Sequence, residues 1–472
     1  MATNDLIVAI ELGSSKIAGA VGRKRVDGTL QVLAYANEPV SGFVRRGVVY
    51  NIDKTAQSLT NIINRLEPEM NNATIGQAYV GVGGYTLHSE LNTVVRTFGE
   101  ETRVTDAIVT EMEEENAAKR YAGHDMLIMV SQEYKIGNNA SNEPVGVNCS
   151  RIEGNYLNIL ARASVMDNTN KSFGTAGIEI ADDSIAPLEA AKVLLTDNER
   201  RQGCVLIDLG ADTTTVSIYK GGYLRFLTVV PLGGQNITRD LCSLQLDEQE
   251  AERIKRKYGV LYPAAGDETV QVDGERTIEL RKVHEVIEAR LEEILLNVVH
   301  QVETSGYELK NLLAGVVCCG GGINLKGIEE ALAQKFQSAK IRLAHDTVTQ
   351  VEWDTAERPV EGTQGVLVGL LMAGEETCIQ EIPMEIKPED ESKAVTGNLF
   401  TDDGESAQEE RDRKREEELK RRRAEAAAKA QERKEKQKGF LAGLVKKIKS
   451  VGDNMEKIAT DFLKDEEMDD NQ

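Results

Sequence analysis

The stretch "IDLGADTTTVSIYKGG", residues 207–222, sets an acidic residue, a glycine and small hydroxyl residues between two apolar segments. Asp208 and Gly210 come first, and Thr213 and Thr214 follow within the same bend. Glycine and aspartate are common in turns and threonine is common in strands, so this stretch alone predicts a β-hairpin and nothing more. A second stretch of the same form changes that interpretation.

The N-terminal stretch "DLIVAIELGSSKIAGAVG", residues 5–22, repeats the pattern of apolar run, acidic residue, glycine with hydroxyls, and apolar run. Such a bend presents backbone N–H groups and hydroxyls without bulky side chains, which suits phosphate oxygens. A carboxylate beside phosphate can hold Mg²⁺ through water. Two facing bends therefore predict a nucleotide clamp in which Glu11 and Asp208 are the candidate catalytic and metal-holding carboxylates.

A third turn, "VVCCGGGINLKGIEEAL" (316–332), consists of a strand, three glycines and a helix. Glycines at a helix start let the backbone approach a flat ligand closely. One such motif is weak evidence, but three in this order favour a nucleotide site. The candidate nucleotide-binding residues in these turns are Gly13, Ser14, Ser15, Lys16, Gly210, Asp212, Thr213, Thr214, Gly320, Gly321 and Gly322.

The bulk composition limits the classes of protein to consider. A chain of 472 residues exceeds the size of a single core, so we expect at least two domains. The net charge of −22 lies entirely in residues 1–404, because 405–472 hold 18 basic and 18 acidic side chains, and this argues against nucleic-acid binding. We find no transmembrane run, no signal peptide and no metal-type pairing among the six cysteines, which favours the cytoplasm.

Hydrophobic patterning organises the chain into segments. We expect strands at 5–11, 16–23, 30–36 and 77–84, and a helix over 53–66 with Asp53 as its N-cap. Residues 86–163 read as a self-contained α+β insertion, with a charged helix followed by two strand-like runs. A long helix is expected over 281–305, preceded by a short strand-like patch around 269–280.

The composition changes after residue 382. Residues 385–404 have the Pro, Asp, Glu and Ser content of a linker, and 405–438 form a dense mix of opposite charges. Together, 385–438 are interpreted as a tether, either helical or disordered. Residues 439–464 instead place one apolar stripe along a helix. The stripe consists of Phe440, Leu444, Ile448, Val451, Met455, Ile458 and Phe462.

Three interpretations of this last helix are open. It could dock on the body of the protein, but a tether of about fifty residues is a poor way to fill a core. Its stripe also fits the heptads of a coiled coil. Lysines opposite the stripe favour a third interpretation, a helix lying in a membrane interface. A single helix of this kind binds weakly, so stable attachment requires several copies and hence self-association.

The order of these motifs resembles the actin-like ATPases, and more narrowly the FtsA family of bacterial cell-division proteins. Residues 8–16, 205–221 and 316–328 are similar to the two phosphate hairpins and the adenosine motif. "GTQGVLVGLL" resembles the closing helix of that fold, and "EAERIKRKYG" (250–259) resembles the helix that holds ribose and adenine. Further similar segments are "SGFVRRGVVYNIDK" and "VIEARLEEIL" (286–295). The resemblance covers about residues 5–380 and the final helix.

This resemblance implies a two-lobed, ribonuclease H-like α/β fold that holds ATP and Mg²⁺, with Glu252, Lys255 and Arg256 at the ribose and adenine. It also implies that the inserted subdomain faces other division proteins and that Arg290 contacts the C-terminal tail of FtsZ, the tubulin-like ring protein. The protein would form filaments on the cytoplasmic face of the inner membrane at the division site. The implied divisions are a first lobe of 1–85 with 164–200, an insertion of 86–163, a second-lobe core of 201–235 with 311–382, a smaller subdomain of 236–310, a tether of 385–438 and a membrane helix of 439–464.

Departures from the family pattern favour nucleotide binding over fast hydrolysis. The family usually has aspartate where this chain has Glu11. In the second hairpin, Asp212 adds a carboxylate that would be unfavourable near phosphates unless Mg²⁺ or a lysine offsets it. Relatives often carry a glutamate before proline to position the attacking water, where this chain has Ala186 and, one turn on, Glu189. Glu189 is the remaining candidate for a catalytic role.

Other members of the superfamily are less consistent with the sequence. A sugar kinase or phosphatase would need a catalytic base in the insertion, and no residue there is singled out. An Hsp70-like chaperone would carry a β-rich domain where the charged tether stands. A rod-shape filament protein would lack the insertion and the tether. A coiled coil at the last helix would instead indicate a cytoplasmic scaffold.

Overall fold

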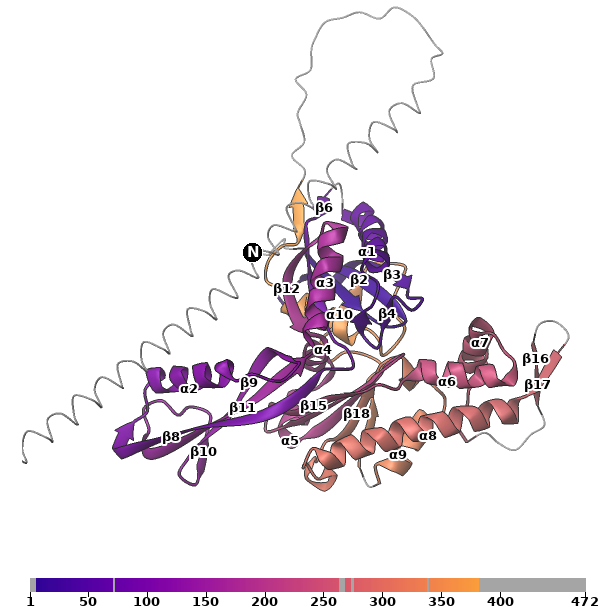
Figure 1. Cartoon of the computed structure of the whole chain (residues 1–472). Helices are drawn as coiled ribbons and strands as arrows, with labels where there is room; N and C mark the ends of the chain where they lie inside the picture. The colour runs from indigo at the N-terminus through magenta and orange to yellow at the C-terminus, as the bar shows by residue number, and fades with distance from the viewer. Residues whose placement is uncertain (1–5, 71–72, 263–267, 273–275, 338, 382–472) are drawn as a thin grey trace, which may run out of the picture. The chain divides into compact units, whose positions relative to one another are not determined.

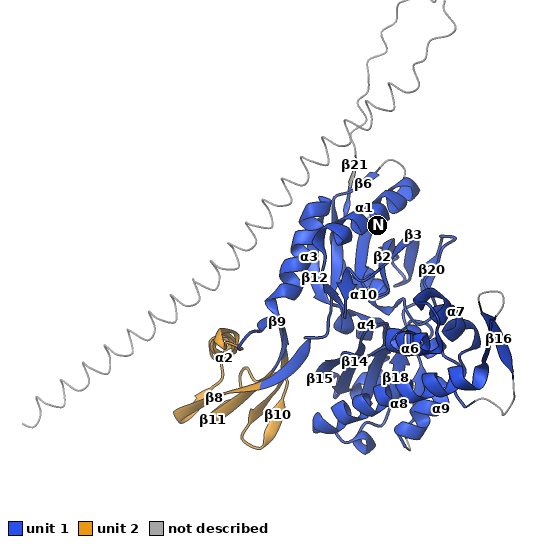
Figure 2. Cartoon of the chain, turned by 45° about the vertical axis from the view of Figure 1, so that its right-hand side comes forward, with its two compact units in different colours: residues 1–91, 122–130, 157–423 blue, residues 92–121, 131–156, 424–472 orange. Residues whose placement is uncertain are grey.

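The computed structural model describes residues 6–70, 73–262, 268–272, 276–337 and 339–381 (Figure 1). The tether and the final helix predicted from the sequence, with the seven residues of the apolar stripe, lie outside the described residues. The described chain divides into two units (Figure 2). The first holds 6–91, 122–130 and 157–381, and the second holds 92–121 and 131–156.

The first lobe is built on a six-stranded sheet in the order β12-β7-β1-β2-β3-β20. β1 pairs antiparallel with β2 and parallel with β7, so the N-terminal hairpin lies at the centre of the sheet. The strands are β1 (Ile7–Leu12), β2 (Lys16–Lys24), β3 (Leu30–Pro39), β7 (Gln77–Val82), β12 (Glu179–Ile185) and β20 (Val351–Trp353). The helices of the lobe are α1 (Ile52–Leu66), α3 (Ala163–Ala176), α4 (Ala186–Leu194) and α10 (Gly365–Ala373).

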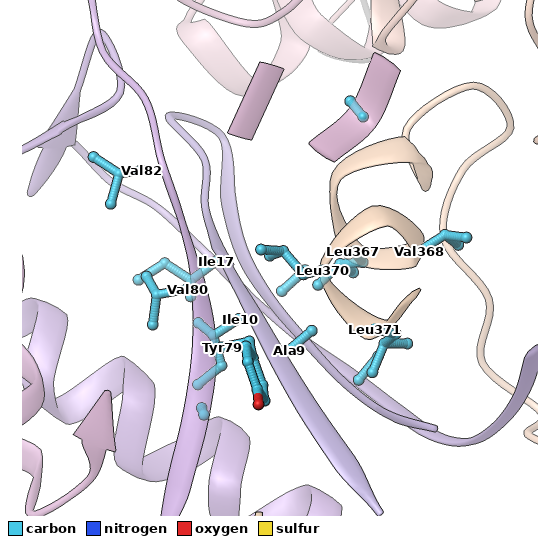
Figure 3. Packing of buried hydrophobic residues seen from close by; sticks show 14 of the residues in the cluster. Ala9, Ile10, Ile17, Tyr79, Val80, Val82, Leu367, Val368, Leu370 and Leu371 are labelled. Atoms are coloured by element: carbon cyan, nitrogen blue, oxygen red, sulfur yellow. The ribbon is translucent and has the colours of Figure 1, made fainter. Parts of the chain in front are cut away.

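Helices cover both faces of this sheet. Gly19 of β2 packs on Ile62 of α1, whereas Gly22 packs on Leu371 of α10. A sheet buried on both faces needs apolar residues at consecutive positions, which explains the unbroken apolar run of β1. α10 is apolar all round because it lies between β1, β2, β7 and α4, and Figure 3 shows its Leu370 and Leu371 next to Ala9 of β1.

The predicted strands and helix of the first lobe are found with small shifts in their bounds. The predicted N-cap is wrong by two residues: the Asn51 side chain accepts a hydrogen bond from the Lys54 N–H, and Asp53 lies inside the first turn of α1. Both residues can cap a helix, and the helix begins at the first that offers an acceptor. Asp53 still lies in the first turn, where an acidic side chain is favourable.

The second lobe is centred on β13, which pairs antiparallel with β14 and parallel with β18 in a nine-stranded sheet. Val205 and Ile207 face one core while Cys204 and Leu206 face the other, so this sheet is also covered on both sides. Its strands, from one edge to the other, run β10-β9-β11-β8-β15-β14-β13-β18-β19. The bounds in the second lobe are β13 (Cys204–Leu209), β14 (Thr214–Lys220), β15 (Tyr223–Val230), β18 (Gly315–Cys319) and β19 (Ile341–Leu343).

The helices of the second lobe pack on this sheet. The long helix α8 contacts β14, β15, α6 and α9, and a two-stranded sheet precedes it. The bounds are α5 (Asp197–Gln202), α6 (Gly234–Leu241), α7 (Glu248–Tyr258), β16 (Thr269–Val272), β17 (Arg276–Glu279), α8 (Leu280–Thr304) and α9 (Ile328–Lys335). Within the described residues, no helix is long and apolar enough to cross a membrane.

The predicted insertion, 86–163, contains a charged helix and long strands. Their bounds are β8 (His88–Arg103), α2 (Asp106–Ala118), β9 (Asp125–Ile136), β10 (Asn139–Ser141) and β11 (Asn148–Ala161). The second unit has its own core, in which Met112 and Tyr156 are buried and the rings of Tyr134 and Tyr156 meet edge to face with centroids 6.3 Å apart. Thr105 caps α2 by accepting from the Ile108 N–H.

Two small two-stranded sheets complete the first lobe. β4 (Val44–Arg45) pairs with β5 (Val48–Val49), and β6 (Ala73–Ile75) pairs antiparallel with β21 (Ile379–Glu381). The last described strand is therefore hydrogen-bonded to a strand from the beginning of the chain.

Candidate nucleotide site

The two acidic bends join β1 to β2 and β13 to β14, and each requires glycine at one position. A Cβ on Gly13 would lie 2.6 Å from the Lys16 carbonyl oxygen, and one on Gly210 would lie 2.8 Å from the Thr213 carbonyl oxygen. Both distances are shorter than a Cβ tolerates, so each bend can fold back on itself only because this side chain is missing. The backbone of each bend is thereby left open to an anion.

Glu11 and Asp208, the acidic residues of the bends, both have raised pKa values, chiefly because they are buried. Glu11 Oε2 is buried and accepts no hydrogen bond from the described residues. Burial raises the pKa of Glu11 to about 7, with Lys16 lowering it and the charge of Asp208 raising it further. Burial also raises the pKa of Asp208 to about 6. Two carboxylates disfavoured in their charged form are a natural place for a cation.

Lys16 connects the first bend to the third turn. Its Nζ lies 3.4 Å from Tyr35 Oη and 3.3 Å from Thr363 Oγ1, to which it donates. The preceding residue, Gly362, accepts a hydrogen bond through its carbonyl oxygen from the Gly320 N–H at 2.9 Å. Burial lowers the pKa of Lys16, and the nearby charge of Glu11 opposes that shift.

The three glycines of the third turn differ in what surrounds them. Gly320 has φ +86°, and a Cβ there would lie 2.3 Å from Asp208 Oδ1. A Cβ on Gly322 would lie 2.6 Å from the Leu209 side chain. Gly321 has no neighbour closer than Thr363 Cγ2 at 3.9 Å, so it alone has room for a side chain. The sequence alone does not distinguish these three glycines. In the structure, Gly320 and Gly322 pack closely against β13 and Gly321 does not.

Glu252, Lys255 and Arg256 lie on α7 and pair with one another. The Glu252 carboxylate accepts from Thr238 Oγ1 and pairs with Lys255 and Arg256, each at 2.6 Å. Burial raises the pKa of Glu252, but the Lys255 charge and these hydrogen bonds outweigh it, and the net shift is downward. The charge of Arg256 also contributes to lowering the pKa of Lys16, so α7 lies within electrostatic range of the first bend.

Asp212 is placed differently from the expectation that its charge would face phosphate. Its Oδ1 accepts from Arg239 Nη2 and its Oδ2 accepts from the backbone N–H of Arg46, both at 3.1 Å. An arginine and a backbone amide, and no lysine, therefore offset this carboxylate. In the first bend, Ser14 Oγ accepts from the Gly47 N–H at 2.8 Å. Arg46 and Gly47 lie in the segment "SGFVRRGVVYNIDK", and no pattern in its sequence indicates that it contacts both bends.

Glu189 is engaged with a lysine of its own helix. Its side chain is buried on α4 and accepts hydrogen bonds from Lys192 Nζ at 2.7 and 2.8 Å. Burial chiefly raises the pKa of Tyr219, and the charge of Glu189 adds to that shift. Tyr219 lies opposite Cys204, at the end of β13 remote from Asp208. The catalytic role of Glu189 stays a prediction.

Ala186, at the start of α4, is the residue of that helix near the first bend. A Cβ built on Gly81 would lie 3.2 Å from Ala186 Cβ, and Gly81 pairs with Glu11 across β1 and β7. The helix therefore presents a methyl group at the position where a water-positioning carboxylate was considered.

Arg290, the candidate partner residue on α8, is engaged within the chain. It makes a two-pronged ion pair with Asp240 of α6 and a further pair with Glu293 on its own helix. The Asp240 hydrogen bond raises the pKa of Arg290, with burial acting in the opposite direction. Helical spacing alone indicates Glu293 as a partner of Arg290, whereas Asp240 lies 50 positions away and no local pattern indicates it.

The residues at the bends fit Mg²⁺ better than a metal held by protein alone. Among the described residues, no three His, Cys, Asp or Glu side chains gather in a way that could hold a metal ion. Mg²⁺ commonly uses one or two carboxylates together with phosphate oxygens and water. Glu11 Oε2, which accepts no hydrogen bond from the described residues, and the Asp208 carboxylate each lie next to an open glycine bend, and they match that donor set.

Comparison with known proteins gives consistent results. Residues 205–357 match the family model "Cell division protein FtsA". The cell division protein FtsA of Porphyromonas gingivalis is 31% identical over 353 residues, which cover 72% of this chain and 73% of the relative. That of Pseudomonas aeruginosa is 29% identical over 409 residues, covering 84% and 94%.

Similarity to solved structures extends to the fold. A protein of the PilM–PilN type IV pilus biogenesis complex matches with a TM-score of 0.57 at 15% identity. The match covers 78% of this chain and 98% of that chain. The architecture is the actin-like ATPase fold that the sequence predicts.

Proposed function

Because the chain belongs to the FtsA family of actin-like cell-division proteins, we propose that it binds ATP with Mg²⁺ at its two bends and anchors an FtsZ ring to the membrane. The observation that carries the nucleotide half of the proposal is that each glycine bend is preceded by a buried carboxylate, Glu11 in the first bend and Asp208 in the second. Their pKa values are raised beside two glycine bends, and no described residue satisfies Glu11 Oε2.

Each group at the site has an assigned task under this proposal. Backbone N–H groups of Gly13–Lys16 and Gly210–Thr213 bind phosphate oxygens, and Lys16 contributes a positive charge. Glu11 and Asp208 hold Mg²⁺ through its water, and the bound ion offsets the charge of the phosphates. Gly321 lies against the adenosine, where its missing side chain leaves room. Glu252, Lys255 and Arg256 contact ribose and adenine from α7.

Hydrolysis is proposed to be slow. The position near the first bend that could hold a water-positioning carboxylate carries Ala186, and Glu189 is paired with Lys192. Positioning of the attacking water is a large part of phosphoryl-transfer catalysis. We therefore expect turnover well below about 10 s⁻¹, the median for enzymes.

The anchoring half of the proposal concerns the end of the chain. Residues 439–464 lie in the interface of the inner membrane, on its cytoplasmic face, and 385–438 connect them to the lobes. Because one such helix binds weakly, the protein self-associates so that many helices act together. The smaller subdomain, 236–310, receives the FtsZ tail, and the inserted subdomain contacts other division proteins at the division site.

A substitution at Gly321 tests the nucleotide site. Gly321 is the one glycine of its turn with open space, so Gly321→Glu fills the adenosine position without displacing β13. We expect at least a hundredfold loss of affinity for a fluorescent ATP analogue, with unchanged circular dichroism. Gly99→Glu, at an exposed glycine with no neighbour within 4 Å, is the matched control and binds like wild type. Wild-type affinity in Gly321→Glu overturns the assigned site.

A further inference from the structure

A short strap, defined as residues 42–50, lies against both bends. It contains β4 and β5, and its tip is Arg46-Gly47, where the backbone turns with φ +50° and φ +73°. Arginine rarely adopts this left-handed conformation, which costs on the order of 1 kcal/mol. A conformation of this kind persists only where surrounding contacts hold it, and such contacts are found on both sides of the tip.

The first lobe holds one side of the tip. The Arg46 carbonyl oxygen accepts from the Tyr85 N–H at 2.9 Å, and the Gly47 N–H donates to Ser14 Oγ at 2.8 Å. Gly47 also packs on Gly84, because a Cβ on Gly47 would lie 2.8 Å from Gly84 Cα. The strap is thus fixed to the bend that carries Glu11.

The second lobe holds the other side. The Arg46 N–H donates to Asp212 Oδ2, and Arg239 Nη2 donates to Asp212 Oδ1. Only 11% of the Asp212 side chain is exposed. Both carboxylate oxygens are therefore hydrogen-bonded and largely shielded from solvent. Arg239 lies on α6, whose first turn is hydrogen-bonded to the second bend through Gly234 and Gln235. One carboxylate therefore joins a donor from each lobe.

We propose that Arg46, Asp212 and Arg239 form a latch between the lobes that controls nucleotide exchange. The latch crosses between the two phosphate bends, so a nucleotide enters or leaves only when the lobes separate there and the Arg46–Asp212 hydrogen bond breaks. The Asp212 side chain is then a positioning group that does not touch phosphate, and Asp212→Ala keeps the backbone N–H of the second bend. This inference rests on the proposed nucleotide site, and it assigns that site a means of regulation.

If Asp212 instead faced the phosphates, removing Asp212 and removing Arg239 should change nucleotide affinity in opposite directions. If its carboxylate faced the phosphates directly, removing the charge would tighten nucleotide binding by relieving repulsion. Removing Arg239 would then expose the charge and weaken binding. A latch instead predicts that either change acts in the same direction, because each breaks one side of the same connection.

Stopped-flow binding of a fluorescent ATP analogue with Mg²⁺ separates these roles. The variants are Asp212→Ala, Arg239→Gln and the two combined, with Arg253→Gln as the control because Arg253 pairs with Glu250 on neighbouring α7. We expect Asp212→Ala and Arg239→Gln each to raise both the association and dissociation rate constants by about threefold to tenfold, as for the net loss of one ordinary hydrogen bond. The Kd should change less than about twofold, and the double variant should match Asp212→Ala.

Hydrogen exchange provides a readout that needs no nucleotide. The amides of residues 43–50 should exchange faster in nucleotide-free Asp212→Ala than in wild type or Arg253→Gln. Opposite shifts of Kd in Asp212→Ala and Arg239→Gln, or unchanged rates in both, overturn the latch while leaving the nucleotide site intact. Failure of wild type to bind the analogue overturns the nucleotide site and the latch together.

Discussion

Glu11 holds a buried carboxylate oxygen that accepts no hydrogen bond from the described residues, and this has consequences for stability. Its pKa is raised from the ordinary 4.5 to about 7, chiefly by burial. The folded protein therefore keeps a proton that the unfolded chain releases as pH rises from about 4.5 to 7. Stability falls through that window, and the full cost is present above pH 7. Placing a charged group where it destabilises the empty protein is typical of a binding site.

Replacing Glu11 with glutamine removes this cost. We expect Glu11→Gln to raise the free energy of unfolding of the nucleotide-free protein at pH 8 by on the order of 3 kcal/mol, and to have little effect near pH 4.5. Urea unfolding measured across this pH range tests the sign. The same variant should lose the stabilisation that ATP with Mg²⁺ gives to wild type.

Two comparisons make that measurement specific. Glu69→Gln, at an exposed glutamate of the same lobe, should leave the pH profile unchanged. A Glu11→Gln effect of equal size at pH 5 and pH 8 would mean that the carboxylate is not protonated in the folded protein, and the explanation by burial would be wrong.

At the scale of elements, Arg290 connects α8 to α6 and is also the candidate contact for the acidic tail of FtsZ. Two variants distinguish these roles. Arg290→Trp should weaken pull-down of an FtsZ tail peptide about tenfold, while ATP binding is unchanged. Asp240→Ala frees the guanidinium from α6, so a peptide-binding arginine should then bind the tail at least as well as in wild type.

The result for Asp240→Ala decides between the roles of Arg290. If both variants lose the peptide equally, Arg290 acts by holding α6 against α8 and the contact surface is elsewhere on residues 236–310. If neither variant changes the pull-down, Arg290 is not involved.

At the scale of the whole molecule, nucleotide binding and membrane binding are assigned to segments that a tether separates. Phe440→Glu with Leu444→Glu would place two charges in the lipid interface, where burying the apolar stripe is favourable by about 25 cal/mol per Å². We expect the double variant to remain in the soluble fraction in flotation with anionic liposomes, and to bind the ATP analogue with wild-type affinity.

Salt and charge provide the control for the membrane prediction. Each lysine near anionic lipid contributes roughly 1 kcal/mol, so wild-type flotation should weaken at high ionic strength and with neutral lipid. Flotation of the double variant with anionic liposomes would refute the assignment of 439–464.

Local patterns predicted the bends, because an apolar run, an acidic residue and a glycine specify a hairpin within a few positions. The apolar run of β1 and the all-apolar α10 likewise show where the sheet is covered on both faces. Contacts between residues far apart in the sequence could not be predicted. Arg46 meets Asp212 across 166 positions, and no local pattern signals that pairing. The pairing of Glu189 with Lys192 was not predicted either, because the search for a water-positioning carboxylate considered only the turn on which Glu189 lies, and its catalytic role stays a prediction.

The pairing of β21 with β6 implies an order of events during synthesis. The first lobe takes β20, α10 and β21 from beyond residue 350, so its sheet stays uncovered on one face while the ribosome makes the second lobe. The second lobe and the insertion complete their own strands earlier. A nascent chain released before α10 is made would leave the apolar face of β1 and β2 in water and should be recognised by chaperones. The site at the two bends can therefore form only after nearly the whole described chain has been translated.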